Sequence, residues 1–189
     1  MNLPRLILAS ASPRRAELLR ELHIPFEVIP SEAEEAHTEQ LTAIELCQLN
    51  AYRKARAVAK RLPDGLVIGV DTLVTLESAL YGKPRDLADA ARMLRELQGK
   101  THRVVSGVCL LHLRRHRQKI FFDQTLVTFR PLSEASIRAY HGRIQPLDKA
   151  GGYAIQEHGD QIVESYSGSY HNVVGLPLEC LSEELRGWK

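Results

Sequence analysis

Two adjacent arginines stand where a helix is expected to begin. Residues 10–15 read Ser-Ala-Ser-Pro-Arg-Arg and follow a short apolar run. Ser12 suits the N-cap and Pro13 suits the first helical position. Cations in the first turn meet the positive end of the helix dipole and cost stability, so Arg14 and Arg15 indicate a bound anion. Backbone N–H groups and two guanidinium groups would cradle a phosphate. The other interpretation is that both arginines face solvent.

Asp71 is a second candidate, because it comes directly after the apolar run 66–70. A strand that is buried on both faces and ends in an aspartate places the carboxylate at the carboxyl edge of the sheet, where open α/β folds bind ligands. Asp71 could equally close a turn or cap the next segment. Glu34 and Glu35 lie in an acidic loop, which alone is typical of solvated surface. Together with Asp71 they could supply the oxygen ligands that Mg²⁺ prefers.

Three lysines and one glutamine are further candidates. Lys54 lies on a long expected helix, whereas Lys83 and Lys149 each lie in a glycine-containing loop, where the backbone can approach a ligand closely. A single lysine is usually a surface residue. The amide of Gln156 offers both a donor and an acceptor and could bind a nucleobase, although an ordinary loop hydrogen bond is the simpler interpretation.

The composition is that of a globular protein without a strong charge bias. The chain has 189 residues, is 44% hydrophobic and 25% charged, and carries a formal net charge of +2. The charge gives little support for a stable nucleic-acid partner, and the basic run 114–117 is better explained as a solvated turn. Three widely spaced cysteines favour free thiols in a reducing compartment. With no apolar stretch long enough to cross a membrane, we expect a cytoplasmic protein.

The order of elements predicts an α/β protein with a mixed, twisted sheet and flanking helices. Apolar residues at helical spacing, among them Leu49 and Ala55, define the buried stripe of the long helix. The expected strands are 6–9, 25–29, 66–70 with an optional continuation over 73–76, a hairpin of 102–113 and 120–129, and a segment near 161–166. The expected helices are 13–22, 41–62, 86–97, 133–141 and one near the C-terminus.

Five motifs extend over nearly the whole chain in a fixed order. They are Ser-Ala-Ser-Pro-Arg-Arg at 10–15, Gly-Val-Asp-Thr at 69–72, Gly-Lys-Pro at 82–84, Asp-Lys-Ala-Gly-Gly-Tyr-Ala-Ile-Gln at 148–156 and Gly-Ser-Tyr-His-Asn-Val-Val-Gly-Leu-Pro-Leu at 168–178. In this order they closely resemble the Maf family of nucleotide pyrophosphatases. The resemblance implies a single Maf-like domain over 1–189, with two lobes around a cleft as in the inosine triphosphate pyrophosphatases, and often a homodimer. It also implies hydrolysis of a nucleoside triphosphate to the monophosphate and pyrophosphate with a divalent metal, Mg²⁺ or Mn²⁺.

The same resemblance assigns roles to individual residues. Asp71 would be the general base that activates water, or a ligand of the metal that does so, and Glu35 would help to bind that metal. Arg14, Arg15, Lys54 and Lys83 would hold the phosphates, with Lys54 and Lys83 counted among the catalytic residues. Ser10, Ser12 and Lys149 would also bind the substrate. Water attack at the α-phosphorus needs a metal, cations and a proton acceptor, and the assigned residues are of these types.

Base choice is assigned to Arg14, Thr72 and Gln156. The two arginines after Pro13 and the Ile-Gln pair resemble the branch that acts on dTTP and UTP, whereas the 7-methyl-GTP branch tends to have an aromatic residue in place of Arg14. Glu157 departs from the glycine that the family commonly has after the glutamine. The family's association with septum formation leaves a second hypothesis, a nucleotide-sensing regulator of cell division that does not need hydrolysis.

Overall fold

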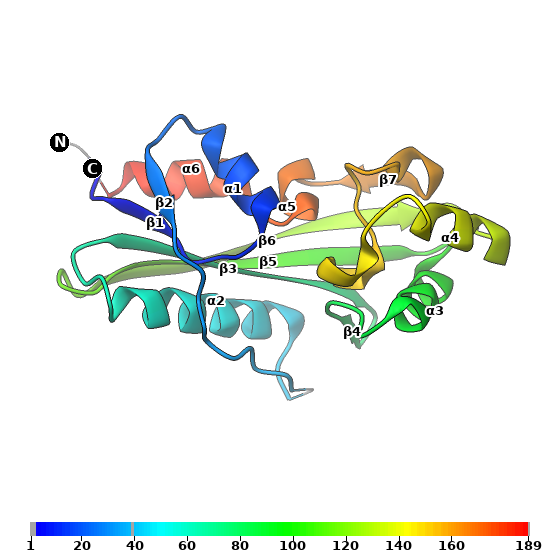
Figure 1. Cartoon of the computed structure of the whole chain (residues 1–189), viewed down its shortest axis with the longest axis horizontal. Coiled ribbons are helices and arrows are strands. Elements are labelled where there is room, and N and C mark those ends of the chain that lie inside the picture. Colours follow the sequence, from blue (N-terminus) through cyan, green and yellow to red (C-terminus); the bar gives the residue numbers. More distant parts are fainter. Residues whose placement is uncertain (1–2, 39, 189) are drawn as a thin grey trace. The chain divides into compact units, whose positions relative to one another are not determined.

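The computed structural model describes residues 3–38 and 40–188, which form two compact units (Figure 1). The first unit comprises Met1–Asp71, Ser106–Asp123 and Gly175–Lys189, and the second comprises Thr72–Val105 and Gln124–Val174. The described residues contain a seven-stranded sheet with hydrogen-bonded order β2-β1-β3-β5-β6-β7, in which β4 also pairs with β3. The sheet is mixed, because β1 is parallel to β2 and β3 whereas β3–β4 and β6–β7 are antiparallel. The expected α/β class is therefore confirmed.

The first unit begins with a strand, a loop and a helix. The elements are β1 (Leu6–Leu8), α1 (Pro13–Arg20) and β2 (Phe26–Val28). Ser12 is the N-cap and Pro13 is the first helical residue, as predicted. The Ser12 side chain makes no capping hydrogen bond; instead its backbone N–H donates to Ser10 Oγ at 3.2 Å. A hydrogen bond between two loop residues thus fixes the loop directly before the two arginines.

Helix α2 (Ala43–Ala59) packs against one face of the first unit's part of the sheet, while α1 and α6 (Leu178–Arg186) cover the other (Figure 1). Thr42 and Glu45 form a capping box that starts α2. A glycine lets α2 approach β3 (Leu66–Leu76), because a Cβ at Gly69 would lie 2.1 Å from the Ala51 carbonyl oxygen. Close packing at Gly69 therefore sets the distance between α2 and the first half of β3.

The second unit is built around one apolar core. Leu94 on α3, Phe129 on β6, and Ile137 on α4 are all buried in it. His102 also lies among these residues, and its Nε2 is 2.8 Å from the Tyr153 hydroxyl. The elements wholly within this unit are β4 (Ala79–Tyr81), α3 (Leu87–Leu97), α4 (Glu134–His141), β7 (Val163–Ser167) and α5 (Tyr170–Val174), with 3₁₀ turns at Pro146–Asp148, Ala150–Gly152 and Gly159–Gln161. Strands β5 (Thr101–His112) and β6 (Arg117–Phe129) each have residues in both units.

The structure differs from the sequence-based expectations in a few places. The strand expected over 66–70 continues through Asp71 to Leu76, which confirms the optional extension; the expectation that the strand ends at Asp71 is therefore wrong. Strand β4 and the five-residue helix α5 were not predicted, since both are too short to show a hydrophobic period. No helix within the described residues has the length and apolar character needed to cross a membrane.

Candidate active site

Lys54 contacts two carboxylates in the first unit. Its Nζ lies 2.6 Å from Glu35 Oε1 and 2.7 Å from Asp71 Oδ1. The side chain of Lys54 is 12% exposed and that of Asp71 is 7% exposed, whereas that of Glu35 is 35% exposed. Three residues that the sequence proposes separately, from a loop, a helix and a strand, are thus brought together.

Asp71 owes its position to strand β3. The backbone from Leu66 to Val70 is buried, and β3 runs parallel to β1. Ser10, which follows β1, is also buried. The parallel pairing of β1 with β3 covers Leu66–Ile68, so Ser10 and Asp71 both follow the parallel part of these strands, although β3 itself continues to Leu76.

Arg15 joins three segments of the first unit. Its Nε donates to the Gly175 carbonyl at 2.8 Å, and its Nη1 donates to the Val70 carbonyl at 3.0 Å and to Ser10 Oγ at 3.3 Å. Removal from water lowers the pKa of Arg15, and the charge of Asp71 opposes that shift. Arg15 therefore holds the α1 loop against Val70 on β3, the residue before Asp71.

Arg14 and Ser12 are both half-buried near the start of α1. Arg14 contributes a further positive charge beside Arg15, since it lowers the pKa of that neighbour. Two cations therefore lie at the positive end of the helix dipole, the arrangement that indicated an anion site.

Asn50 was missed by the sequence analysis. It is 2% exposed, and its Nδ2 donates to Asp71 Oδ2 at 3.1 Å. The helical spacing predicted that Leu49 belongs to the buried stripe of α2. Leu49 is 37% exposed, so that part of the prediction is wrong. The helix is rotated so that Asn50 faces inward. Its spacing of four residues from Lys54 was the available signal, because such residues share one helix face.

Four of the other expected site residues belong to the second unit. Thr72 follows Asp71 on β3 and is half-buried, and Lys83 and Gln156 are exposed. The loops that carry Lys83 and Lys149 are joined, because the Gly151 N–H donates to the Gly82 carbonyl at 3.0 Å. Gly151 has φ +73°, which favours glycine at this junction.

The Lys149 ammonium is buried and surrounded by oxygens. It lies 2.7 Å from the Gln145 carbonyl, 2.8 Å from Asp148 Oδ1 and 3.3 Å from Glu157 Oε1. Gln156 Nε2 lies 3.5 Å from the same Glu157 oxygen. Glu157, where the family commonly has glycine, therefore connects Lys149 with the amide that is expected to contact the base.

The basic run 114–117 lies at the turn between β5 and β6, and part of it contacts the rest of the first unit. Arg114 forms an ion pair with Asp64. Arg117 donates to the Gly187 carbonyl at 2.7 Å and lies 4.2 Å above the Trp188 ring. These contacts give two of the arginines a structural explanation.

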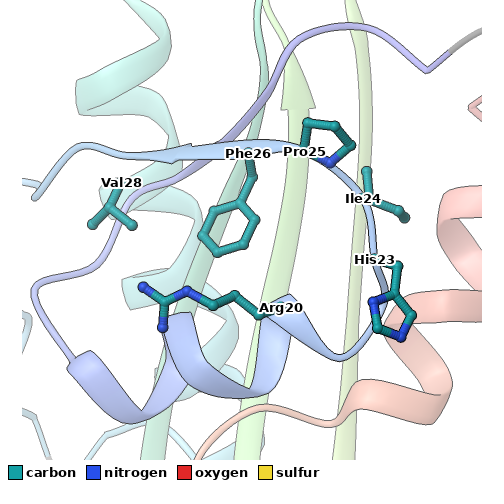
Figure 2. Close-up of a pocket in the computed structure, with 6 residues that line it drawn as sticks. All are labelled: Arg20, His23, Ile24, Pro25, Phe26 and Val28. Carbon is teal, nitrogen blue, oxygen red and sulfur yellow. The ribbon is translucent and has the colours of Figure 1, made fainter.

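A surface pocket of about 370 Å³ lies elsewhere in the first unit, between the end of α1 and β2 (Figure 2). Its lining contains none of the expected site residues. The residues are Arg20, His23, Ile24, Pro25, Phe26 and Val28.

The residues present fit a divalent cation of the kind that also binds phosphate. No three histidine, cysteine, aspartate or glutamate side chains gather around one point within residues 3–38 and 40–188. Glu35 and Asp71 are two carboxylates that both contact the Lys54 ammonium. Mg²⁺ is commonly held by one or two carboxylates and completed by water and substrate phosphates.

The fold and site define an α/β protein in which carboxylates and cations from a loop, a helix and strand β3 come together. The family model for Maf-like protein matches residues 5–188, so the chain belongs to the Maf family.

Relatives named "dTTP/UTP pyrophosphatase" resemble the chain over nearly its whole length. The protein of Carboxydothermus hydrogenoformans is 42% identical over 184 residues, covering 97% of this chain and 98% of the relative. That of Bacillus cereus is 43% identical over 185 residues, covering 98% and 90%. That of Bacillus anthracis is 44% identical over 182 residues, covering 96% and 94%.

Proposed function

We propose that this protein hydrolyses dTTP and UTP to the nucleoside monophosphate and pyrophosphate. The observation that carries the proposal is the identity of 42–44%, over nearly the whole chain, with relatives that bear this activity in their names. The Lys54, Glu35 and Asp71 cluster provides the chemical groups that such a reaction needs. Water attacks the α-phosphorus, the bond to the bridging oxygen breaks, and pyrophosphate leaves.

Asp71 is proposed as the general base that takes the proton from the attacking water. Its carboxylate has about four acceptor sites, more than the hydrogen bonds from Lys54 and Asn50 use. Those two donors fix its orientation, and a fixed acceptor is what general-base catalysis requires.

Arg14, Arg15 and Lys83 are proposed to bind the triphosphate, together with Ser10, Ser12 and Lys54. The dipole of α1 and the guanidinium groups favour an anion at the start of that helix. Arg15 also donates hydrogen bonds to backbone carbonyls, so part of its contribution is to hold the anion site in its conformation. Cations around the phosphates stabilise the charge that develops in the transition state.

Glu35 and Asp71 are proposed as the protein ligands of Mg²⁺ or Mn²⁺. A bound divalent cation would polarise the α-phosphate and lower the pKa of a water ligand. Both carboxylates contact the Lys54 ammonium.

Base choice is proposed to involve Gln156, Thr72 and Arg14. The Gln156 amide can accept from the N3–H of thymine or uracil and donate to a neighbouring carbonyl oxygen. Lys149 is proposed to affect substrate binding indirectly, by holding the loop that carries Gln156. Its ammonium contacts Asp148 and Glu157 in that region.

We propose further that the protein acts in the cytoplasm as a homodimer. Cys47, Cys109 and Cys180 are free thiols, which suits a reducing compartment. The dimer is the assembly that the family resemblance implies, and light scattering on the purified protein tests it.

The decisive experiment is a nucleotide panel with product identification. Purified protein is incubated with Mg²⁺ or Mn²⁺ and each of dTTP, UTP, dCTP, GTP and 7-methyl-GTP. We expect pyrophosphate and monophosphate, with dTTP and UTP turned over fastest. Release of orthophosphate, or nucleotide binding without turnover, would reject the proposal. Asp71→Asn should keep the fold and lose turnover by about 10²–10⁴-fold, the usual contribution of a general base.

A further inference from the structure

The Asn50 side chain is buried and uses its whole amide in hydrogen bonds. It is 2% exposed and lies on α2, one turn before Lys54. Its Oδ1 accepts from the Ala36 N–H at 2.7 Å. Its Nδ2 donates to the Ala36 carbonyl at 3.2 Å and to Asp71 Oδ2 at 3.1 Å. One side chain therefore contacts both the acidic loop and the Asp71 carboxylate on β3.

These partners determine the orientation of the amide. If the group were rotated by half a turn, its oxygen would face the Ala36 carbonyl and the Asp71 carboxylate, and its NH₂ would face the Ala36 N–H. Two of the contacts would then pair an acceptor with an acceptor, and the third would pair a donor with a donor. An aspartate at position 50 would place a second carboxylate against Asp71, which is unfavourable. The site therefore specifies an amide.

Asn50 and Lys54 act on the same two segments in complementary ways. Lys54 contacts the Glu35 side chain and Asp71 Oδ1. Asn50 contacts the backbone of the next loop residue, Ala36, and Asp71 Oδ2. Lys54 alone would leave the Asp71 carboxylate able to turn about its last side-chain bond, whereas two donors on its two oxygens prevent that rotation.

We propose that Asn50 is a positioning residue, which fixes the rotation of the Asp71 carboxylate and anchors the acidic loop at Ala36. Its effect on turnover rests on the proposed function, whereas its anchoring of the loop does not. A misplacement of about 1 Å in a catalytic group can cost about 10²-fold in rate. Asn50 acts through Asp71 and the loop and need not touch the nucleotide.

Two substitutions separate the two contacts. Asn50→Leu has a similar size and removes every hydrogen bond, whereas Asn50→Asp keeps an oxygen acceptor for the Ala36 N–H but places a carboxylate against Asp71. Arg53→Leu, at an exposed position of the same helix, is the matched control. Asn50→Ala is made in parallel, so that the result does not depend on how well leucine fits.

Turnover is measured per folded molecule. For Asn50→Leu and Asn50→Asp we expect kcat to fall by about 10–100-fold, the cost of a misplaced catalytic group. KM should change by less than about threefold, because Asn50 does not contribute to binding of the substrate in its ground state. A role in packing alone predicts that Asn50→Asp, once folded, turns over at the wild-type rate, and that result would overturn the proposal.

Hydrogen exchange at the Ala36 amide gives a readout that does not depend on activity. Exchange should become at least about tenfold faster in Asn50→Leu and Asn50→Ala, because the amide loses its acceptor. It should stay slower in Asn50→Asp than in Asn50→Leu. Equal exchange in the wild type and Asn50→Leu would refute the anchoring. If the wild type had no pyrophosphatase activity, the proposed function would fail, while the exchange result would still decide whether Asn50 anchors the loop.

Discussion

The Lys54 ammonium lies 2.7 Å from Asp71 Oδ1, and little of either side chain is exposed. The same ammonium reaches Glu35 Oε1 at 2.6 Å, so one cation neutralises two carboxylates from different segments. Removing one partner of a buried ion pair costs far more than the pair itself contributes, because the remaining charge stays buried without compensation. The geometry around Lys54 therefore affects both stability and chemistry.

Lys54→Met should lower both stability and turnover. The two carboxylates would face each other without the ammonium, and we expect the free energy of unfolding to fall by about 3 kcal/mol. Turnover of dTTP should fall by about 100-fold or more, since the proton acceptor loses the donor that orients it. Urea unfolding and pyrophosphate release measure the two effects.

Two further variants test the cause of that loss. Lys60→Met, at the exposed end of α2, should behave as the wild type. Adding Glu35→Gln to Lys54→Met should recover part of the lost stability, because it removes one of two like charges. The interpretation is wrong if the double variant is less stable than Lys54→Met.

Gly69→Ala should separate α2 from β3. The added Cβ would lie 2.1 Å from the Ala51 carbonyl oxygen and 2.7 Å from the Ala55 nitrogen, both of them backbone atoms of the helix. Overpacking of this kind typically costs 1–3 kcal/mol, and a clash with backbone places the expected loss at about 3 kcal/mol or more. Turnover should fall as well, because Lys54 lies between Ala51 and Ala55 on α2.

Gly65→Ala is the matched control for that substitution. Its Cβ would lie 2.4 Å from Ile7 Cδ1, the far end of a flexible side chain that can rotate away. Urea unfolding should therefore show a clearly smaller loss for Gly65→Ala than for Gly69→Ala. Equal losses would show that α2 can shift away from β3 without difficulty.

Part of this site could be read from the sequence and part could not. The apolar run before Asp71 predicted a buried strand, but β3 continues past Asp71 to Leu76, so the carboxylate lies within the strand and not at its end. The face of α2 was harder. Its alanines fit more than one rotation of the helix, and only the contacts of Asn50 with Ala36 and Asp71 show why the polar residue faces inward while Leu49 is exposed.

Partners distant in sequence were also beyond a pattern-based prediction. Lys54 and Asp71 are 17 residues apart, and no periodic signal connects a helix face to a residue of a strand. The motif around Lys149 marked a glycine-rich loop, but the depth at which the ammonium is buried depends on Gln145 and Glu157. Residue types were therefore predictable, and their pairing was not.

His102 should make the second unit sensitive to acid. Burial lowers the pKa of His102 to about 4, below the ordinary value of 6.5. The folded protein favours the neutral form of the His102 ring. The resulting contribution to the free energy of unfolding is complete above pH 6.5 and is lost as the pH falls from 6.5 toward 4. By linkage this amounts to about 2–3 kcal/mol of unfolding free energy between pH 7 and pH 4.5.

Urea unfolding at pH 7, 5.5 and 4.5 measures this loss. His102→Gln, which does not titrate in this range, should reduce the pH dependence by about 2–3 kcal/mol. His116→Gln, at an exposed turn position, should leave it unchanged. If His102→Gln and the wild type lose stability in parallel, other groups account for the acid sensitivity.

Arg14 and Arg15 should differ in what their removal costs. Arg15→Ala leaves the Val70 and Gly175 carbonyls without their donor, and hydrogen bonds to charged groups contribute about 1.5–3 kcal/mol each, so we expect a loss of about 2–4 kcal/mol. Arg14→Ala removes a cation from the positive end of α1 and should change stability by less than about 1 kcal/mol. Its effect should fall on substrate binding, with KM for dTTP raised by about tenfold.

Urea unfolding and steady-state kinetics on both variants measure these effects on stability and on KM. An Arg14→Ala protein as unstable as Arg15→Ala, with unchanged KM, would mean that both arginines are structural.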